Sequence, residues 1–281
     1  KIKESTYLNY TYIINTYLNV KFRKKRLSYF LNYDINLYID MLEEKLAKKT
    51  VRDIILVLKS ILKYAEQKYS VNLKLDLITM PTTHKNELKV FTEKEIKKLE
   101  AECLKSDNIR SIGIVIAIYT GMRIGEICAL KWENIDFAKG IIAVNKTLQR
   151  AYVGKKETKI IISTPKTQKS ERKIPIPSVL YNELKIKSIE YSKQAYVLTG
   201  DEEKYVEPRT LQYLYKKIIE SAKIKYRNFH CLRHTFATRC IRVGMDIKSL
   251  SEVLGHADVN ITLNRYVHSS YDSTKKYMEK L

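Results

Sequence analysis

Three short motifs near the C-terminal end decide the fold of this chain: Phe229-His230-Cys231-Leu232-Arg233-His234, then Leu254-Gly255-His256, then Asn264-Arg265-Tyr266. His230 and Arg233 are three residues apart in a segment of helical character, so their side chains are expected on one face of a helix. Gly255 follows the amphipathic run 246–254, where a helix stop is expected. His256 is then expected at the exit of that helix, and Tyr266 in another short helical pattern.

These side chains could together bind an anion and supply a nucleophile. A guanidinium presents a fixed fork of donors to the oxygens of a phosphodiester, and imidazoles can donate hydrogen bonds or move protons near neutral pH. A phenol, with a pKa of about 10, needs such neighbours before it can attack phosphorus. Each histidine taken alone is read more simply as an ordinary core or surface residue. The ordered set favours a reactive site.

A zinc site is an alternative interpretation of the same segment. Its ligands would be His230, Cys231, His234 and Cys240. These residues lack the paired spacing that is typical of zinc ligands, so we expect no metal.

The order His230-x-x-Arg233, Leu254-Gly255-His256 and Tyr266 resembles the C-terminal signature of the tyrosine recombinases, also called phage-type integrases. Members of that family carry a further catalytic arginine and a lysine upstream. The similarity of residues 110–267 to the family is strong, and that of residues 1–80 is weaker.

The upstream arginine is expected at Arg123. Gly121 permits a sharp turn, Arg123 opens a helix, and Glu126 lies one turn further on, where it can hold the guanidinium by a charge-assisted hydrogen bond. A plain surface pair of Arg and Glu is the simpler alternative. The segment resembles the family's first arginine motif, including Leu130-x-Trp132, which identifies Arg123 as the first catalytic arginine and Glu126 as its support.

A basic β-hairpin arm is predicted over residues 141–177. Its β-branched runs are 140–149 and 158–164, separated by a turn signal that contains Gly154. Lys166, in Pro165-Lys166-Thr167, matches the position of the family's hairpin lysine. Basic residues of the arm and of the N-terminal third are candidates for contacts with the DNA backbone: Lys24, Lys25, Arg26, Lys48, Lys49, Lys155, Lys156, Lys169 and Arg172. For any single lysine of the N-terminal third, a solvated charged face is the simpler interpretation. For Lys155, Lys156 and Lys169 the simpler interpretation is plain electrostatic attraction to the DNA backbone.

Composition supports a polyanion as partner. The 281 residues include 52 Lys and Arg against 31 Asp and Glu, a formal net charge of +21. No run approaches the roughly 20 apolar residues of a membrane-spanning helix. The four scattered cysteines predict reduced thiols in a cytoplasmic protein. The chain begins with Lys1 rather than Met, which predicts a fragment. The integrases that it resembles usually carry an additional N-terminal arm-binding domain, and removal of such a domain is consistent with this start.

The pattern of helices predicts two domains. Residues 1–80 contain three helical patterns; the clearest is the apolar stripe that begins at Ile54, with Thr50 and Asp53 as a possible capping box. Residues 81–91 are expected to be a linker. Thr92 and Glu95 form a second capping box that opens a domain over residues 92–281, with a short amphipathic tail at 269–281.

The resemblance implies a mainly α-helical fold with a small antiparallel β-sheet and hairpin. It further implies that a helical core-binding domain and a mixed α/β catalytic domain together form a clamp around DNA. It implies that Arg123 and Arg233 hold the scissile phosphate, that His230 handles the proton of Tyr266, and that His256 donates to a non-bridging oxygen. Lys166 then protonates the leaving oxygen. Tyr266 attacks to form a 3′-phosphotyrosyl bond, without ATP, metal or other cofactor.

The implied function is site-specific recombination for a mobile element, most like the integrases of Gram-positive conjugative transposons, in a nucleoid-associated protein. A Xer-type resolvase and a type IB topoisomerase share this chemistry, and a non-catalytic DNA-binding regulator is the alternative from another class. The expected partners are double-stranded DNA and further copies of the chain, as a dimer or tetramer with the tail exchanged in trans. Excisionase and host DNA-bending proteins are further expected partners.

Overall fold

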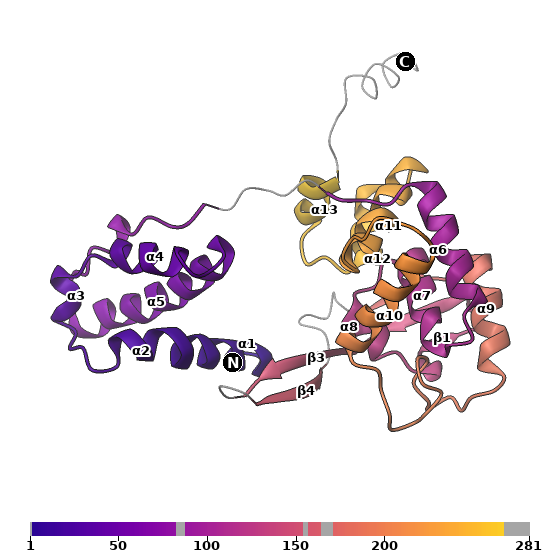
Figure 1. Cartoon of the computed structure of the whole chain (residues 1–281), viewed down its shortest axis with the longest axis horizontal. Helices are drawn as coiled ribbons and strands as arrows, with labels where there is room; N and C mark the ends of the chain where they lie inside the picture. Colours follow the sequence, from indigo (N-terminus) through magenta and orange to yellow (C-terminus); the bar gives the residue numbers. More distant parts are fainter. Residues whose placement is uncertain (1, 83–87, 154–156, 164–170, 267–281) are drawn as a thin grey trace, which may run out of the picture. The chain divides into compact units, whose positions relative to one another are not determined.

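The computed structural model describes residues 2–82, 88–153, 157–163 and 171–266. The chain is mainly helical with small antiparallel sheets, which confirms the predicted fold class (Figure 1). Contacts within the chain divide it into two compact units. The N-terminal unit comprises residues 1–87 and 150–160, and the C-terminal unit comprises residues 88–149 and 161–281.

The N-terminal unit is built around one long helix. Its helices are α1 (Glu4–Ile13), a π-helical turn (Ile14–Leu18), α2 (Asn19–Phe22), α3 (Tyr29–Asn32), α4 (Ile35–Glu43), α5 (Lys48–Tyr69) and a 3-10 turn (Leu75–Leu77). The predicted apolar stripe lies on α5, where Ile54, Ile55 and Leu58 are buried in the core of this unit. The predicted cap of this helix is wrong, because α5 begins earlier, at Lys48, and Ala47 precedes it without a side-chain cap.

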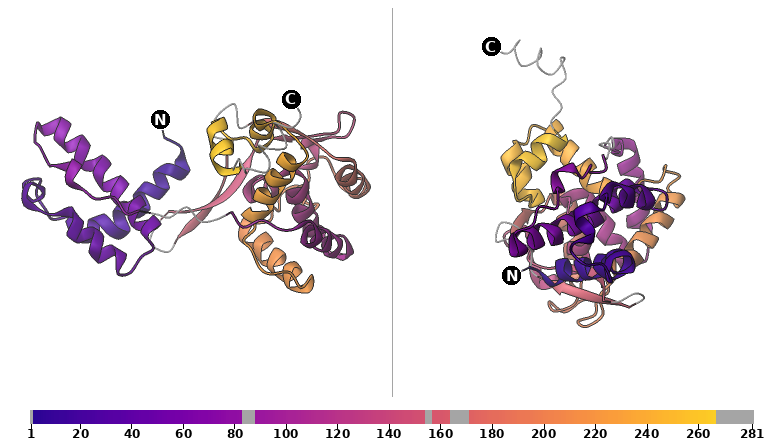
Figure 2. Two further views of the ribbon diagram at one scale, coloured as in Figure 1. Left: turned by 90° about the horizontal axis from the view of Figure 1, so that it is seen from above. Right: turned by 90° about the vertical axis from the view of Figure 1, so that its left-hand side faces the viewer.

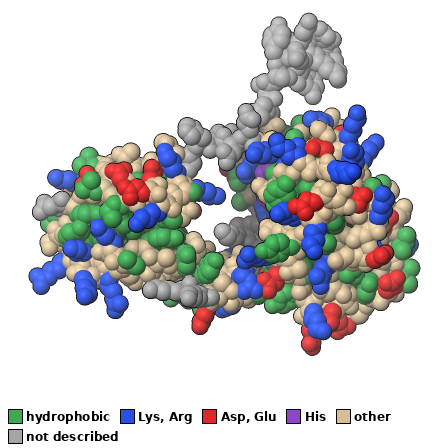
Figure 3. Space-filling view, in the orientation of Figure 1, with side chains coloured by type: hydrophobic (Ala, Val, Ile, Leu, Met, Phe, Trp, Pro, Cys, Tyr) green, Lys and Arg blue, Asp and Glu red, His purple; other side chains and the backbone are tan. Residues whose placement is uncertain are grey.

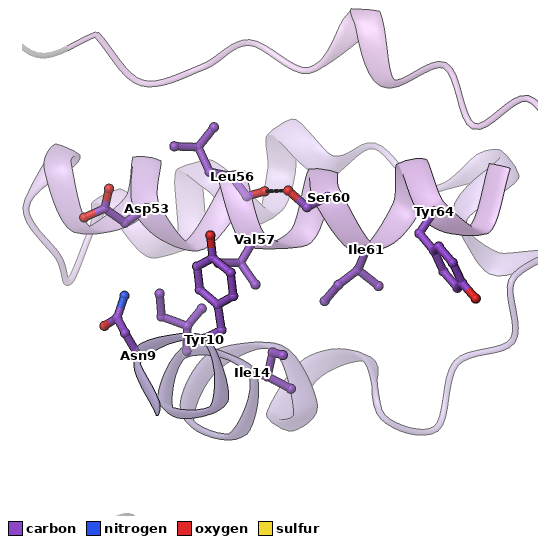
Figure 4. A pocket seen from close by; sticks show the side chains of 10 residues that line it. Asn9, Tyr10, Ile14, Asp53, Leu56, Val57, Ser60, Ile61 and Tyr64 are labelled. Carbon is purple, nitrogen blue, oxygen red and sulfur yellow. Dashed lines mark hydrogen bonds between the residues drawn. The ribbon is translucent and has the colours of Figure 1, made fainter. Parts of the chain in front are cut away.

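An apolar groove with a volume of about 680 Å³ runs between α1 and α5. Figure 4 shows Tyr10 and Ile14 on one side of the groove, facing Val57 and Ile61 on the other. Asp53 is the single ionisable carboxylate among its lining residues. The groove therefore offers apolar contact rather than a set of catalytic groups.

Residues 150–160 of the arm belong to the N-terminal unit by their contacts. Tyr152 stacks on Tyr12 of α1, with ring centroids 4.9 Å apart. Lys159 forms an ion pair with Glu4. Among the described residues, Tyr152 and Lys159 of the arm thus contact α1.

The C-terminal unit carries helices around one buried helix. Its elements are α6 (Glu93–Lys105), a 3-10 turn (Ile109–Ser111), α7 (Ile112–Thr120), α8 (Ile124–Cys128), a 3-10 turn (Trp132–Asn134), β1 (Ile135–Asp136), β2 (Ile141–Val144), β5 (Arg172–Pro175), α9 (Ser178–Ser188), α10 (Pro208–Ser221), α11 (His230–Arg242), α12 (Ile247–Leu254) and α13 (Val259–Tyr266). The residues of β3 (Thr147–Tyr152) and β4 (Thr158–Ser163) are divided between the two units. Helix α7 is apolar on all sides and almost entirely buried, as expected of a central helix. The predicted capping box at Thr92 and Glu95 is confirmed at the start of α6.

The strands of the arm form two small sheets. Strands β1, β2 and β5 pair antiparallel in the order β1-β2-β5, with Ile142 opposite Ile174, and β3 pairs with β4. The run 140–149, expected as one strand, is divided between β2 and β3. Helices α11, α12 and α13 lie side by side in the orange-to-yellow part of the chain (Figure 2).

The four cysteines are buried and none is in a disulfide. Burial raises the pKa of the Cys103 and Cys128 thiols to about 12. They are therefore protonated packing residues at neutral pH. None of the described helices is long and apolar enough to cross a membrane.

Candidate active site

The turn between α7 and α8 places the first arginine. Gly121 ends α7 in the left-handed region, with φ of 61°, and a Cβ there would lie 2.5 Å from Phe236. Arg123 then caps α8. Glu126 accepts hydrogen bonds at 2.8 Å from both the backbone N–H and the Nη1 of Arg123. The predicted support of Arg123 by Glu126 is present, and 40% of the Arg123 side chain remains exposed.

Glu126 also binds Arg172. Arg172 donates from Nη1 and Nη2 to the two carboxylate oxygens of Glu126, at 3.1 and 2.8 Å. Burial alone would raise the pKa of Glu126, but the hydrogen bond from Arg172 and the charges of Arg172 and Arg123 outweigh it and lower that pKa to about 2. This carboxylate is ionised throughout the neutral range.

Arg172 was expected to contact the DNA backbone, and the structure requires a correction. Only 9% of the residue is exposed. Besides its two bonds to Glu126, its Nε donates to the carbonyl oxygen of Val253 at 2.6 Å. Its Nε, Nη1 and Nη2 all donate within the C-terminal unit, so it is not the exposed side chain that was expected to reach the DNA backbone from the arm.

The second arginine, Arg233, is held by backbone carbonyls. It lies on the first turn of α11 and is 2% exposed. Its Nη1 donates to Gly121 O at 2.9 Å, and its Nη2 donates to Leu254 O at 2.7 Å. Burial, followed by the charge of Arg123, lowers the pKa of Arg233 to about 9, which leaves the guanidinium charged at neutral pH.

Both arginines meet at the C-terminal end of α12. Arg123 Nη2 donates to Gly255 O at 3.2 Å, next to the carbonyl of Leu254 that binds Arg233. Gly255 ends α12 with φ of 65°, which confirms the predicted helix stop. The carbonyl end of a helix carries partial negative charge and favours cations. This helix end therefore fixes two guanidinium groups beside each other.

His256 follows directly and is partly buried. Its Nδ1 lies 2.7 Å from the hydroxyl of Thr262, a residue that is completely buried. Burial and the charges of Arg233 and Arg123 lower the pKa of His256 to about 4. The imidazole is therefore neutral at physiological pH, with Nδ1 engaged by Thr262.

Tyr266 is the last residue of α13 and packs on the apolar cluster that includes Ala237, Leu250 and Leu254. Its hydroxyl lies 2.7 Å from Nδ1 of His234. Burial raises the pKa of Tyr266, and the charges of Arg233, Arg265 and Arg123 act in the opposite direction. The phenol is therefore protonated in the free protein.

His234 was not among the predicted catalytic residues. Its position after Arg233 gave no signal in the sequence, because the contact joins residues 32 apart that meet only when α13 packs beside α11. His230, which was expected to handle the proton of Tyr266, is more exposed and lies with its ring edge-on to His234, centroids 4.6 Å apart. The hydrogen bond to the phenol is made by His234.

The structure thus gathers Arg123, Glu126, Arg233, His256 and Tyr266 around the end of α12, with His230 beside them on α11. Lys155, Lys156, Lys166 and Lys169 lie outside the described residues. In the N-terminal unit, five of the proposed backbone contacts are exposed: Lys24, Lys25, Arg26, Lys48 and Lys49. Lys and Arg side chains are distributed over the visible faces of both units (Figure 3).

The arrangement combines fixed cations with a phenol. Two guanidiniums and a neutral imidazole can bind the oxygens of a phosphodiester and stabilise charge as it develops. An imidazole next to a phenol can act as a general base that activates the phenol as a nucleophile. Among the described residues, no three His, Cys, Asp or Glu side chains lie close enough together to hold a metal ion. His230, Cys231, His234 and Cys240, the ligands of the zinc alternative, therefore form no such group.

Comparison with known proteins bears on the same region. Residues 89–273 match the phage integrase family. The chain is 34% identical over 200 residues to a XerC-like tyrosine recombinase of Caldanaerobacter subterraneus, a match that covers 65% of this chain and 51% of the relative. It is 31% identical over 228 residues to the transposase of transposon Tn916 from Enterococcus faecalis, covering 74% of this chain and 53% of that protein.

The fold has a counterpart among solved structures. The integrase of transposon Tn1549, solved with a circular intermediate DNA, superposes with a TM-score of 0.79 at 22% identity and covers 100% of this chain and 95% of that one. The chain spans about half the length of the two curated relatives above. The match over residues 89–273, most of the C-terminal unit, shows that this chain belongs to the phage integrase family, the tyrosine recombinases.

Proposed function

We propose that this chain is a site-specific DNA recombinase of a mobile element, which cuts and rejoins DNA strands for excision and integration. One observation carries the proposal. The phenol of Tyr266 is subject to the positive charges of Arg233, Arg265 and Arg123, and Arg233 and Arg123 are held by the carbonyls at the end of α12. A nucleophile beside two fixed guanidiniums suits attack on a phosphodiester.

The proposed cleavage begins with binding of the scissile phosphate by Arg123 and Arg233. His256 donates a hydrogen bond from Nε2 to a non-bridging oxygen, since its Nδ1 is engaged by Thr262. Tyr266 attacks phosphorus, and Lys166 protonates the leaving 5′-oxygen by resemblance to the family. The covalent 3′-phosphotyrosyl bond conserves the bond energy, so rejoining by a 5′-hydroxyl requires neither ATP nor a metal.

A mobile element is the preferred context. The predicted long arm at residues 141–177 and the similarity to the Tn916 transposase support an integrase. The similarity to a XerC-like recombinase supports a resolvase as the second candidate. The two differ in substrate: the first acts on element ends and a target site, the second on a fixed chromosomal site.

The proposed partner is double-stranded DNA. Recombination pairs two cut sites, so we propose a dimer or tetramer on DNA with residues 269–281 exchanged between copies. Excisionase and host DNA-bending proteins would bias the direction of the reaction. The place of action is then the bacterial cytoplasm with its nucleoid.

A nicked suicide substrate tests the chemistry directly. The wild-type protein is expected to form an adduct with nicked DNA of the cognate element end that survives denaturation. Tyr266→Phe is expected to form none, because the phenolic oxygen is the atom that bonds phosphorus. Denaturing gels and mass spectrometry of the linked peptide are the measurements.

Tyr213→Phe is the matched control, because Tyr213 is exposed on α10 of the same unit and should form the adduct normally. An adduct that persists in Tyr266→Phe would place the nucleophile elsewhere. Tight binding of cognate ends without any adduct would favour a DNA-binding regulator that does not cleave.

Thr262 provides a test of the role of His256. Thr262→Val removes the hydroxyl that faces Nδ1 but keeps the side-chain shape, and is expected to slow cleavage about tenfold, the value of one lost buried hydrogen bond. Thr262→Ser keeps the hydroxyl and is expected to cleave at nearly the wild-type rate. Single-turnover rates on the suicide substrate are compared. Equal rates for the Val and Ser variants would show that Thr262 does not orient His256.

A further inference from the structure

We propose that His234, rather than His230, receives the phenolic proton of Tyr266 during strand cleavage. The proposal rests on the recombinase function proposed above and assigns a proton acceptor to the same site. Its basis is the 2.7 Å approach of His234 Nδ1 to the Tyr266 hydroxyl. A general base must lie within hydrogen-bond distance of the proton that it removes, and His234 meets this condition before DNA is bound.

The two histidines differ in their surroundings. His230 and His234 are one turn apart on α11, with their rings perpendicular at 89°. His234 is 7% exposed and its ring lies between His230 and the ring of Tyr266, whose centroid is 5.7 Å away. His230 lies on the solvent side of this stack. The order of the stack places His234 between the nucleophile and the more accessible histidine.

Packing fixes the positions of both Tyr266 and His234. Tyr266 rests on the cluster of Ala237, Leu250 and Leu254, so the ring of the tyrosine is held by apolar contacts. His234 belongs to a buried turn of α11, and its carbonyl accepts a hydrogen bond from Thr238 at 3.0 Å. The phenolic oxygen and Nδ1 are therefore positioned by two separately packed helices, which is the requirement for a preorganised proton transfer.

The charge state of His234 suits an acceptor. Burial, followed by the charges of His230, Arg265, Arg233 and His256, lowers the pKa of His234 to about 3, so the ring is neutral at physiological pH. With its single proton on Nε2, Nδ1 offers a lone pair to the phenol. A bound phosphodiester adds negative charge beside Arg233, which opposes the neighbouring cations and raises the proton affinity of His234. The base thus becomes stronger only when substrate is in place.

The step conserves atoms and charge. The Oη–H bond of Tyr266 breaks and the proton moves to Nδ1, which makes His234 an imidazolium. Oη bonds phosphorus while the bond from phosphorus to the 5′-oxygen breaks. The leaving oxygen carries off the electron pair and takes a proton from the Lys166 ammonium, to become the 5′-hydroxyl. Rejoining runs the same transfers in reverse and restores both residues.

Three variants in single-turnover cleavage of the suicide substrate test the assignment: His234→Gln, His230→Gln and Lys166→Ala. His234→Gln is expected to cleave about 10²–10⁴-fold more slowly, as for loss of a general base. Its remaining rate is expected to rise in proportion to hydroxide concentration from about pH 6 to about pH 9, because hydroxide must then remove the proton. His230→Gln is expected to keep the shape of the wild-type pH profile.

A substrate with sulfur in place of the bridging 5′-oxygen separates base from acid. A thiolate leaves without protonation, so this substrate should restore cleavage by Lys166→Ala but not by His234→Gln. Wild-type rates for His234→Gln, slow cleavage with an unchanged pH profile, or its rescue by the sulfur substrate would each overturn the assignment. Absence of any adduct with wild-type protein would instead count against the recombinase function itself.

A second measurement uses the wild-type protein and does not depend on the folding of a variant. ¹⁵N NMR of the histidine rings, with the His234 signals identified by their shift in Tyr266→Phe, reports which nitrogen carries the proton. An unprotonated Nδ1 that accepts from the phenol is expected. A proton on Nδ1 in the free protein would overturn the assignment.

Discussion

Glu126→Ala is expected to lower the free energy of unfolding of the C-terminal unit by about 3–5 kcal/mol. Glu126 is 6% exposed and holds Arg123 and Arg172. Its removal leaves the buried Arg172 guanidinium without a counterion, and the desolvation of that charge is then uncompensated. The chain has one tryptophan, Trp132, buried in the same unit. Its fluorescence during urea unfolding reports on the C-terminal unit separately from the rest of the chain.

A surface ion pair supplies the control. Glu93 pairs with Arg239 in the same unit, with side chains that are 52% and 30% exposed. Glu93→Ala is expected to change stability by about 0–1 kcal/mol, as for other exposed pairs. The double variant Glu126→Ala, Arg172→Ala should be less destabilised than the sum of the single variants, because no unpaired charge remains. Equal effects of Glu126→Ala and Glu93→Ala would contradict the proposed importance of the buried network.

Binding of the chain to double-stranded DNA is expected to weaken by about 10³-fold or more between about 50 and about 200 mM salt. With a net charge of +21, the protein displaces condensed cations from phosphates when it binds, and added salt opposes their release. Replacing Lys24, Lys25 and Arg26 by Gln is expected to reduce the slope of log K against log salt by about 2–3, roughly one for each phosphate contact. Fluorescence anisotropy over a salt series measures this slope.

Three other exposed lysines provide the matched control. Lys105, Lys139 and Lys204 each lie beside an acidic side chain three residues earlier, at 3.7 or 3.8 Å. Their replacement by Gln also removes three charges, but those charges are already neutralised locally, so the slope should remain that of the wild type. Wild-type binding that does not change with salt, or an equal reduction of the slope in both triple variants, would refute backbone contact by residues 24–26.

Local features of this fold were predictable from sequence. The cap at Thr92, the turn at Gly121 and the helix stop at Gly255 were predictable because each depends on residues within one turn of a helix. The pairing of Arg123 with Glu126 has the same local origin. These signals are sufficient to order the motifs along the chain and to place the arginine at the start of α8.

The errors concern contacts between distant segments. Arg172 lies in a basic run and looked like a DNA contact, whereas its partners Glu126 and Val253 are 46 and 81 residues away. The contact of His234 with Tyr266 likewise depends on how α13 packs on its neighbours. Spacing along a sequence does not encode such contacts. The start of α5 at Lys48 is a separate error: Ala47 precedes the helix without a side-chain cap, so no capping residue marks this start in the sequence.

The end of α12 has a consequence for the divergence of this protein. The carbonyl oxygens of Val253, Leu254 and Gly255 hold Arg172, Arg233 and Arg123, and none of these bonds uses a side chain of α12. Any residue supplies a carbonyl, so the partly buried Val253 can be replaced between lineages while the guanidiniums keep their places, whereas Leu254 is held by the packing of its buried side chain. Gly255 is also constrained, since its positive φ and the 3.0 Å approach of Arg172 to a Cβ at this position exclude larger residues. Related sequences should therefore keep glycine at position 255 even where neighbouring residues differ.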